Sequence, residues 1–290
     1  MVGRLFILLI AMAIASCSSE DESGTAVPVE FVESSSSSLD FVFSSSSIEW
    51  GQPSSSAVEA VNVLRSEMVK MASNGAVVVL GTNLPAAKKS EQPQMSVGFS
   101  YDFSMGRHEV TCGEYNSFVD FMDVGNGRIA RLPCENDSIP ANNVTYYDVV
   151  LFANARSRLE GFDTAYTYKG AVYDNGGHCV GLEKLAFRPE VVGYRLPTEA
   201  EWVFAAQNNW DPGKGWNSGN SEYGVHNVCT AQDVAGEIPS MSLCDMAGNV
   251  MEWTNDWLGS FCDTVLVNYV GGSDGGGLAE GVLEGGRFRN

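Results

Sequence analysis

The chain has 290 residues and carries 17 Lys and Arg against 36 Asp and Glu, so its formal net charge is −19. An acidic surface repels phosphate backbones, and no basic stripe is visible, so we expect no nucleic-acid partner. Only 18% of the residues are charged and 31 are Gly, which predicts a loop-rich, irregular domain more than a helical bundle. With 44% apolar residues the chain can bury a sizeable core.

Residues 1–16 have the features of an export signal. Arg4 supplies the positive charge, and Leu5–Ile14 is an apolar run that is too short to span a bilayer. Cys17 follows directly after small residues, and this pattern resembles the lipobox of bacterial lipoproteins. The resemblance implies that the thiol of Cys17 is acylated and becomes the mature N-terminus. The alternative is an ordinary signal peptide with an incidental Cys.

The residues after Cys17 indicate in which membrane a lipoprotein of this kind would reside. Serines follow it and no Asp stands at the next position, which by the same resemblance favours the outer membrane over the inner one. Two acyl chains bury enough methylene groups to hold a protein stably at a bilayer. We therefore predict a lipid-anchored protein of the bacterial cell envelope, with the membrane as its first partner.

Residues 17–59 are predicted to form a disordered tether, because serine runs bury nothing that offsets chain entropy. As a flexible coil the segment would reach about 35 Å. Two acidic-apolar pieces, Leu39–Phe43 and Ile48–Trp50, interrupt the serines. We expect these pieces to be part of a linker with some apolar character. The alternative is that they contact a membrane or a partner.

Six cysteines follow Cys17, and an even number in an exported protein predicts disulfides. Sequence cannot separate the fifteen pairings that six cysteines allow. No C-x-x-C pair occurs, so zinc-ribbon and thioredoxin-type sites have no support. We expect at least two bridges among Cys112, Cys134, Cys179, Cys229, Cys244 and Cys262.

Three helices are predicted where a Thr is followed three residues later by an acid, because this capping box satisfies the first free N–H groups of a helix. The boxes are Thr111 with Glu114, Thr145 with Asp148, and Thr198 with Glu201. Five segments have strand character: Ala76–Leu80, Tyr101–Met105, Tyr166–Tyr168, Ala171–Tyr173 and Val191–Tyr194. Few, short, mixed elements with long connections predict an α+β domain with ordered loops.

Four blocks of the chain resemble those of the formylglycine-generating enzymes, also called sulfatase-modifying factors. They are Phe103–Thr111 with Tyr115, Asn143–Asp148 with Phe152–Asn154, Tyr194–Trp202, and Leu243–Thr254. The resemblance covers roughly residues 63–290 and implies one domain with a C-type-lectin-like core and low regular secondary structure. Within the third block we expect Arg195 to pair with a carboxylate and Trp202 to lie in the core.

A calcium site is predicted in the fourth block. Asp245, Gly248, Val250 and Glu252 offer two carboxylates and two backbone carbonyls around a Gly that permits a tight turn. Oxygen ligands of this kind suit Ca²⁺, and the resemblance places a structural calcium on the same four positions. The alternative is a surface turn with incidental acids.

A second calcium site is implied by the resemblance at Asn227 and Val228. The carboxylate that would complete it falls where this chain is shorter than the family pattern, and Asp233 is the candidate for that role.

The resemblance stops at the catalytic cysteines. Formylglycine-generating enzymes are copper-dependent oxidases with a close Cys pair, because thiolates suit Cu(I). Here the block that would precede the pair is Leu283–Phe288, and no Cys lies beyond Cys262. We therefore expect no copper and a domain, residues 60–290, that lacks its C-terminal end. Either the gene is truncated or the paralogue has lost the chemistry.

Other enzymatic interpretations have weaker support. Gly271–Gly275 fits the G-x-S-x-G pattern, but more glycines follow where a helix should begin and every His precedes it. Carboxylate pairs for glycoside chemistry have no distinctive spacing here, and His108 is expected to be a structural partner.

The sequence therefore predicts a membrane-tethered, non-catalytic sulfatase-modifying-factor-like module that binds an unknown protein or glycan or has a structural role. The rival is a formylglycine-generating oxidase, copper-dependent and acting on Cys in sulfatases, whose catalytic C-terminus is missing from this chain.

Overall fold

The computed structural model describes residues 67–122, 129–207, 209, 215–222, 224–231, 243–257 and 261–271, together with the backbone of 281–284. Its helices are α2 (Cys112–Phe118), α3 (Tyr146–Leu159) and α4 (Glu199–Ala206), with short 3-10 turns η1 (Lys89–Glu91) and η2 (Val119–Phe121). Its strands are β1 (Met68–Met71), β2 (Val77–Leu80), β3 (Met95–Gly98), β4 (Phe103–Gly106), β5 (Tyr166–Thr167), β6 (Gly170–Tyr173), β7 (Cys179–Glu183), β8 (Ala186–Phe187), β9 (Glu252–Trp257), β10 (Val265–Val267) and β11 (Gly281–Glu284). Short mixed elements joined by long ordered loops confirm the α+β expectation.

All three predicted capping boxes are present. In α2, α3 and α4 the Thr side chain accepts a hydrogen bond from the backbone of the acid three residues later, and that acid accepts from the Thr backbone. Helix α2 ends at Phe118, and its buried face continues through the 3-10 turn η2 with Val119. The local sequence therefore sets where each helix starts.

Four of the five predicted strand segments contain strands, but their pairing is set by distant residues. Strand β5 pairs with β8 and β6 pairs with β7, both antiparallel. The predicted strand at Val191–Tyr194 is wrong. There the backbone N–H of Tyr194 donates to the hydroxyl of Ser157 over 2.7 Å, and Val191 closes a turn onto the carbonyl of Arg188.

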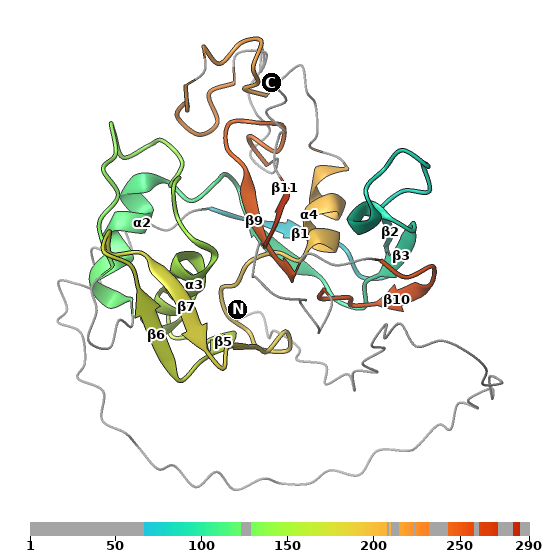
Figure 1. Cartoon of the computed structure of the whole chain (residues 1–290), viewed down its shortest axis with the longest axis horizontal. Coiled ribbons are helices and arrows are strands. Elements are labelled where there is room, and N and C mark those ends of the chain that lie inside the picture. Colours follow the sequence, from blue (N-terminus) through green and yellow to red (C-terminus); the bar gives the residue numbers. More distant parts are fainter. Residues whose placement is uncertain are drawn as a thin grey trace, which may run out of the picture.

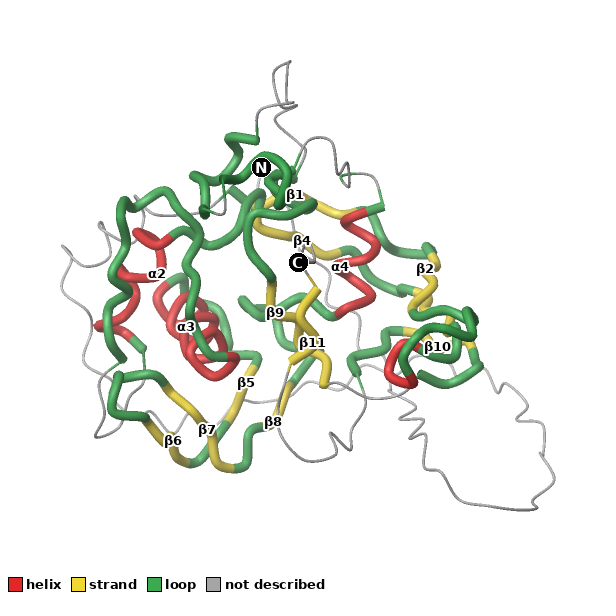
Figure 2. The backbone as a smooth tube through the Cα atoms, turned by 45° about the horizontal axis from the view of Figure 1, so that its top comes forward, coloured by secondary structure: helices red, strands yellow, loops and turns green. Residues whose placement is uncertain are grey.

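The elements form two lobes around a central group. In Figure 1, α2, α3 and strands β5 to β7 lie on the left, the sheet of β2, β3 and β10 lies on the right, and β1, β9, β11 and α4 lie between them. Figure 2 shows the same division in a second view. The right-hand sheet has the order β10-β3-β2, with β10 parallel and β2 antiparallel to β3, so it joins segments about 170 residues apart.

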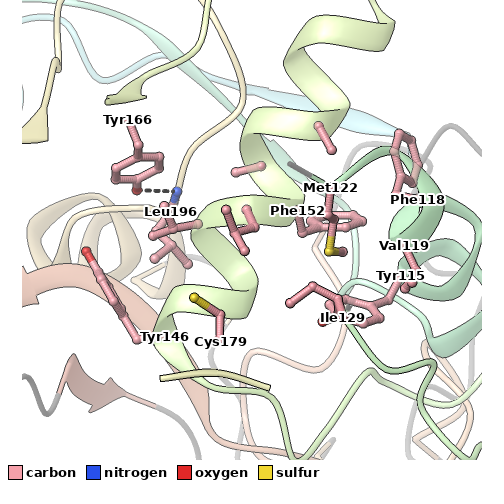
Figure 3. Packing of buried hydrophobic residues seen from close by; sticks show 14 of the residues in the cluster. Tyr115, Phe118, Val119, Met122, Ile129, Tyr146, Phe152, Tyr166, Cys179 and Leu196 are labelled. Atoms are coloured by element: carbon pink, nitrogen blue, oxygen red, sulfur yellow. Dashed lines mark hydrogen bonds between the residues drawn. The ribbon is translucent and has the colours of Figure 1, made fainter. Parts of the chain in front are cut away.

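The main core fills the space between α2, α3 and β5 to β7. Phe152 of α3 stacks on Tyr115 and meets Phe118 edge-on, with ring centroids 5.7 and 5.2 Å apart (Figure 3). Tyr166 is fully buried, and its hydroxyl accepts from the backbone N–H of Leu196 and donates to Asn255 of β9. This aromatic core holds the left lobe against the strand that carries the candidate site.

Two smaller cores lie on either side of α4. Trp202 and Ala205 pack with Val69 and Met71 of β1 and with Leu243 and Met246. Ala200 packs against the inner face of the β10-β3-β2 sheet. Trp202 is therefore a core residue, as predicted.

Two disulfides, Cys112–Cys134 and Cys229–Cys244, confirm the expectation of at least two bridges. Among the described cysteines, Cys179 carries a free thiol, and it is buried. The signal peptide with Cys17, the tether 17–59 and the G-x-S-x-G glycines after Gly271 lie outside the described residues. None of the described helices has the length and apolar character needed to cross a membrane.

Candidate functional site

The predicted calcium loop, residues 245–252, leads directly into β9. Its backbone turns through the left-handed region at Asp245 (φ 57°), Gly248 (φ 112°) and Asn249 (φ 60°). Gly248 is required here for space as well as for its φ, because a Cβ would overlap the carbonyl oxygen of Trp216. A Cβ on Gly215 would in turn overlap the carbonyl of Ala247, so the two glycines let the two backbones touch.

Asn249 fastens this loop to its surroundings and is itself buried. Its backbone N–H donates to Trp216 over 2.9 Å, and its side-chain oxygen accepts from the N–H of His226 over 3.0 Å. Its side-chain nitrogen donates to Glu109 Oε2 and to the carbonyl of His226, each over 3.2 Å. The imidazole of His226 stacks on Trp216 with centroids 3.7 Å apart. Through its backbone and its side chain, Asn249 thus connects the loop to three other segments of the chain, at Glu109, Trp216 and His226.

The structure brings the two predicted calcium segments together. The Cys229–Cys244 disulfide links them, and the N–H of Cys229 donates to Asp245 Oδ2 over 2.5 Å. The carbonyl of Asn227 accepts from the hydroxyl of Thr230, and the N–H of Val228 donates to Ser138. Asp233, the guessed third member of the second site, lies outside the described residues.

Three carboxyl groups gather at the loop, and their environment disfavours ionisation. Desolvation, with the nearby Asp245, raises the pKa of Glu252 to about 7. Burial, with the charges of Glu252 and Asp245, holds the pKa of Glu109 well above its ordinary value. Burial also raises the pKa of Asp245. Mutual repulsion of this kind is relieved by a proton or by a bound cation.

Two oxygens of this group are buried without a hydrogen-bond partner: Asp245 Oδ1 and Glu109 Oε1. Buried carboxylate oxygens in native proteins are normally satisfied. Glu252, by contrast, accepts a hydrogen bond from the indole N–H of Trp202. The unsatisfied oxygen of Asp245 is what an oxygen-ligated hard cation would use.

Within the described residues, no group of three or more His, Cys, Asp or Glu side chains is arranged to hold a metal ion. A cation at this loop would therefore depend on backbone carbonyls as well as on Asp245 and Glu252, which is the mixed donor set that the sequence predicts. Glu109 then supports the loop through Asn249 and does not complete a three-carboxylate site.

Residues 62–290 match the family model of the sulfatase-modifying factor enzyme 1-like domain. The chain belongs to this sulfatase-modifying factor family. That finding agrees with the four sequence blocks, which the structure places on β4 and α2, at the start of α3, on α4, and on the loop before β9.

Individual relatives of this sulfatase-modifying factor domain are distant. The chaperone protein LppX of Paenibacillus barcinonensis is 28% identical over 202 residues, which are 58% of this chain and 67% of LppX. Variable protein 1 of Treponema denticola has 25% identity and a TM-score of 0.51, over 70% of this chain and 78% of that one. PvdO of Pseudomonas aeruginosa has 20% identity and a TM-score of 0.43, over 66% of this chain and 71% of that one.

Two contributors to the site were not predicted from the sequence. The sequence predicts no role for Glu109, and it predicts Trp202 only as a core residue. The signal for Glu109 was an acid inside an otherwise conventional strand-to-helix block, two residues before the capping Thr111. Nothing in the sequence indicated that Trp202 would donate to Glu252, fifty residues later.

Proposed function

We propose that this chain is a surface-tethered, non-catalytic member of the sulfatase-modifying factor family that acts as a binding or structural module. The observation that carries this proposal is the state of the thiols. Among the described cysteines, Cys112–Cys134 and Cys229–Cys244 form two disulfides and Cys262 is also disulfide-bonded, while the free one, Cys179, is buried with a raised pKa that burial causes. A reactive thiolate needs the opposite environment.

The proposed location is the outer membrane of a bacterial cell envelope, with Cys17 as the acylated residue. The ligand would be an exported protein or a glycan. The name of LppX describes that relative as a chaperone, and binding of exported polypeptides is one form that such a module could take. The second candidate is a copper-dependent oxidase that converts Cys to formylglycine in sulfatases and has its Cys pair on a continuation of this chain.

The two candidates are separated by an oxidation assay. We expect no formylglycine in a Cys-containing sulfatase-type peptide incubated aerobically with the purified mature protein, with or without added Cu(I), because no accessible thiol pair is present in the described chain to bind the metal. Mass spectrometry of the peptide is the measurement, with an intact family member as the positive control. Turnover that a copper chelator abolishes would establish the oxidase instead.

We propose further that the loop before β9 binds a structural Ca²⁺ through Asp245, Glu252 and the carbonyls of Gly248 and Val250. The unsatisfied oxygen of Asp245 and the raised pKa of Glu252 support a cation there. Bound calcium would neutralise the carboxylates and stabilise the loop. Asn227 and Val228 remain candidates for a second site, although the carbonyl of Asn227 already accepts the Thr230 hydroxyl.

Calcium binding predicts a shift in thermal stability. A ligand held only by the folded state, at a hundredfold excess over its Kd, stabilises by about 2.7 kcal/mol. For a domain of this size that corresponds to a rise in Tm of about 5–10 °C. We expect chelation to lower the Tm, added Ca²⁺ to restore it, and Glu252→Ala to abolish the response.

Asp256→Asn is the matched control for this experiment. Asp256 is also buried on β9, where burial raises its pKa to about 7, but it faces the N-terminus of α4 and accepts from the N–H of Glu199. Its variant should keep the calcium response whatever its own stability. A melting curve of the wild type that chelator leaves unchanged would show that the loop is metal-free.

The same groups predict the pH dependence of the calcium-free protein. Glu252 and Asp256 each have a folded-state pKa of about 7, above the ordinary 4.5 and 3.8. Between about pH 5 and 7 the folded state retains protons that the unfolded state releases, so stability falls as pH rises through this window. We expect a higher Tm at pH 5.5 than at pH 7.5 in chelator.

Glu252→Gln should make this profile shallower, because Gln keeps an acceptor for Trp202 and does not titrate, while Asp256 still contributes its own slope. Glu190→Gln, on an exposed residue, is the control that should leave it unchanged. Saturating Ca²⁺ should also make the profile shallower, since the cation competes with the proton of Glu252 and leaves the titration of Asp256 in place. A wild-type Tm that rises with pH across this window would contradict the assignment.

A further inference from the structure

The β10-β3-β2 sheet has one buried and one open face. Its buried side chains, such as Val78 and Val97, pack in the core next to α4. Its open face carries four valines that are 44–69% exposed: Val77, Val79, Val265 and Val267. They are among the most exposed large apolar residues of the described chain.

The register of the strands arranges these valines in two rows. Val79 of β2 pairs with Ser96 of β3, and Ser96 pairs with Val265 of β10. Val77 pairs with Gly98, and Gly98 pairs with Val267. Directly paired residues share one face of a sheet, so two valine ridges on the outer strands flank a trough of Ser and Gly. These six residues are called the valine face below.

The charge around the valine face differs from that of the whole chain. Segments 76–98 and 261–269 contain Lys88 and Lys89 against Glu91 and Asp263, so their net charge is zero, whereas the chain carries −19. The two lysines are exposed, and so is Leu84, in the loop that connects β2 and β3. The carbonyl of Gln92 in this loop accepts from the N–H of Phe261, which places the loop beside the start of β10. An apolar face whose connecting loop carries two exposed lysines can approach an anionic surface that the rest of the molecule would repel.

The size of the valine face argues against a second copy of the chain as its occupant. Three strands of three or four residues span about 10 by 13 Å. A stable protein interface needs about 800 Å² on each partner, several times that area. A lipid surface imposes no such minimum, since valine methyls can enter the headgroup boundary while nearby lysines meet anionic lipid.

We propose that the valine face, with Leu84, Lys88 and Lys89, docks on an anionic phospholipid surface. Its position at the right-hand end in Figure 1, remote from α2, α3 and β6, would leave the other lobe free. This inference goes beyond the proposed function. It rests on that function in one respect, which is that an acyl anchor would keep the domain close to the lipid. Docking would fix the orientation of the tethered domain relative to the membrane surface.

Vesicle flotation of the mature chain bearing Cys17→Ser tests this proposal without the acyl anchor. The vesicles contain phosphatidylethanolamine with phosphatidylglycerol, or phosphatidylcholine alone, at lipid concentrations on the order of millimolar. We expect salt-sensitive flotation with the anionic vesicles only. The double substitution Val265→Ser with Val267→Ser should lower the bound fraction about tenfold, and so should Lys88→Glu with Lys89→Glu.

Val172→Ser with Val180→Ser is the matched control, because these valines are 51% and 46% exposed on β6 and β7 in the opposite lobe. Its flotation should equal that of the parent chain, and the melting temperature of each variant reports its folding. No flotation of the parent chain, or equal losses in the valine-face and control variants, would overturn the proposal. So would a concentration-dependent dimer in sedimentation that Val265→Ser with Val267→Ser abolishes. Because the tested chain is unacylated, these outcomes are independent of whether Cys17 is an anchor.

Discussion

Glu201→Ala is expected to destabilise the folded domain by about 3–5 kcal/mol, because it leaves the guanidinium of Arg195 buried without a counter-charge. Glu201 is 1% exposed, and its two oxygens lie 2.7 and 2.6 Å from the Arg195 Nη atoms. It also accepts from the hydroxyl of Tyr101 and the N–H of Thr198. Burial opposes its ionisation, but Arg195 and these donors hold the pKa of Glu201 below its ordinary value. Urea unfolding at neutral pH is the measurement.

The exposed pair of Asp120 and Arg131 is the control for this experiment. Its charged atoms are also 2.7 Å apart, but the side chains are 70% and 54% exposed, so Asp120→Ala should cost at most about 1 kcal/mol. Replacing Glu201 and Arg195 together by apolar residues should cost less than the sum of the single changes, because neither charge is then left alone. Similar losses for Glu201→Ala and Asp120→Ala would contradict the structural role of the buried pair.

Cys17→Ser is expected to abolish incorporation of labelled fatty acid and to move the mature-sized protein from the membrane fraction to the soluble fraction. Two acyl chains on Cys17 would provide essentially all of the stable membrane affinity, since a protein held by a single chain or by weak surface contacts dissociates readily. Cell fractionation followed by a high-salt wash and immunoblotting is the measurement.

Ser18→Ala, one residue later, keeps the thiol and should remain in the membrane fraction with normal labelling. Retention of mature-sized Cys17→Ser protein after the salt wash would demonstrate another anchor. The salt wash matters because docking of the valine face on anionic lipid would be reversed by it, whereas acylation would not.

The elements that could be predicted from the sequence depend on neighbours within a few residues. The capping boxes at Thr111, Thr145 and Thr198 set the starts of α2, α3 and α4, since donor and acceptor lie in one turn. The pairing of Arg195 with a carboxylate likewise involves residues only six apart. The family assignment, too, follows from short contiguous blocks.

What the sequence could not supply are contacts between distant segments. Val191–Tyr194 has strand-forming residues, but hydrogen bonds to Ser157 and Arg188 hold its backbone in turns. The disulfide partners of Cys112 and Cys229 and the parallel pairing of β10 with β3 needed the fold to select one arrangement among many.

The candidate site combines local features of the sequence with contacts between distant segments. The sequence by itself determined the fold class, the family and the loop from Asp245 to Glu252, because glycine and acid spacing are local properties of the chain. Only the tertiary structure decided that Glu109 lies beside this loop, that Asn249 connects them, and that Trp202 donates to Glu252. It also decided which valines stay exposed, since the burial of one face of the β10-β3-β2 sheet depends on where α4 packs. The physical reason is that burial and electrostatic coupling arise between segments that only the folded chain brings together.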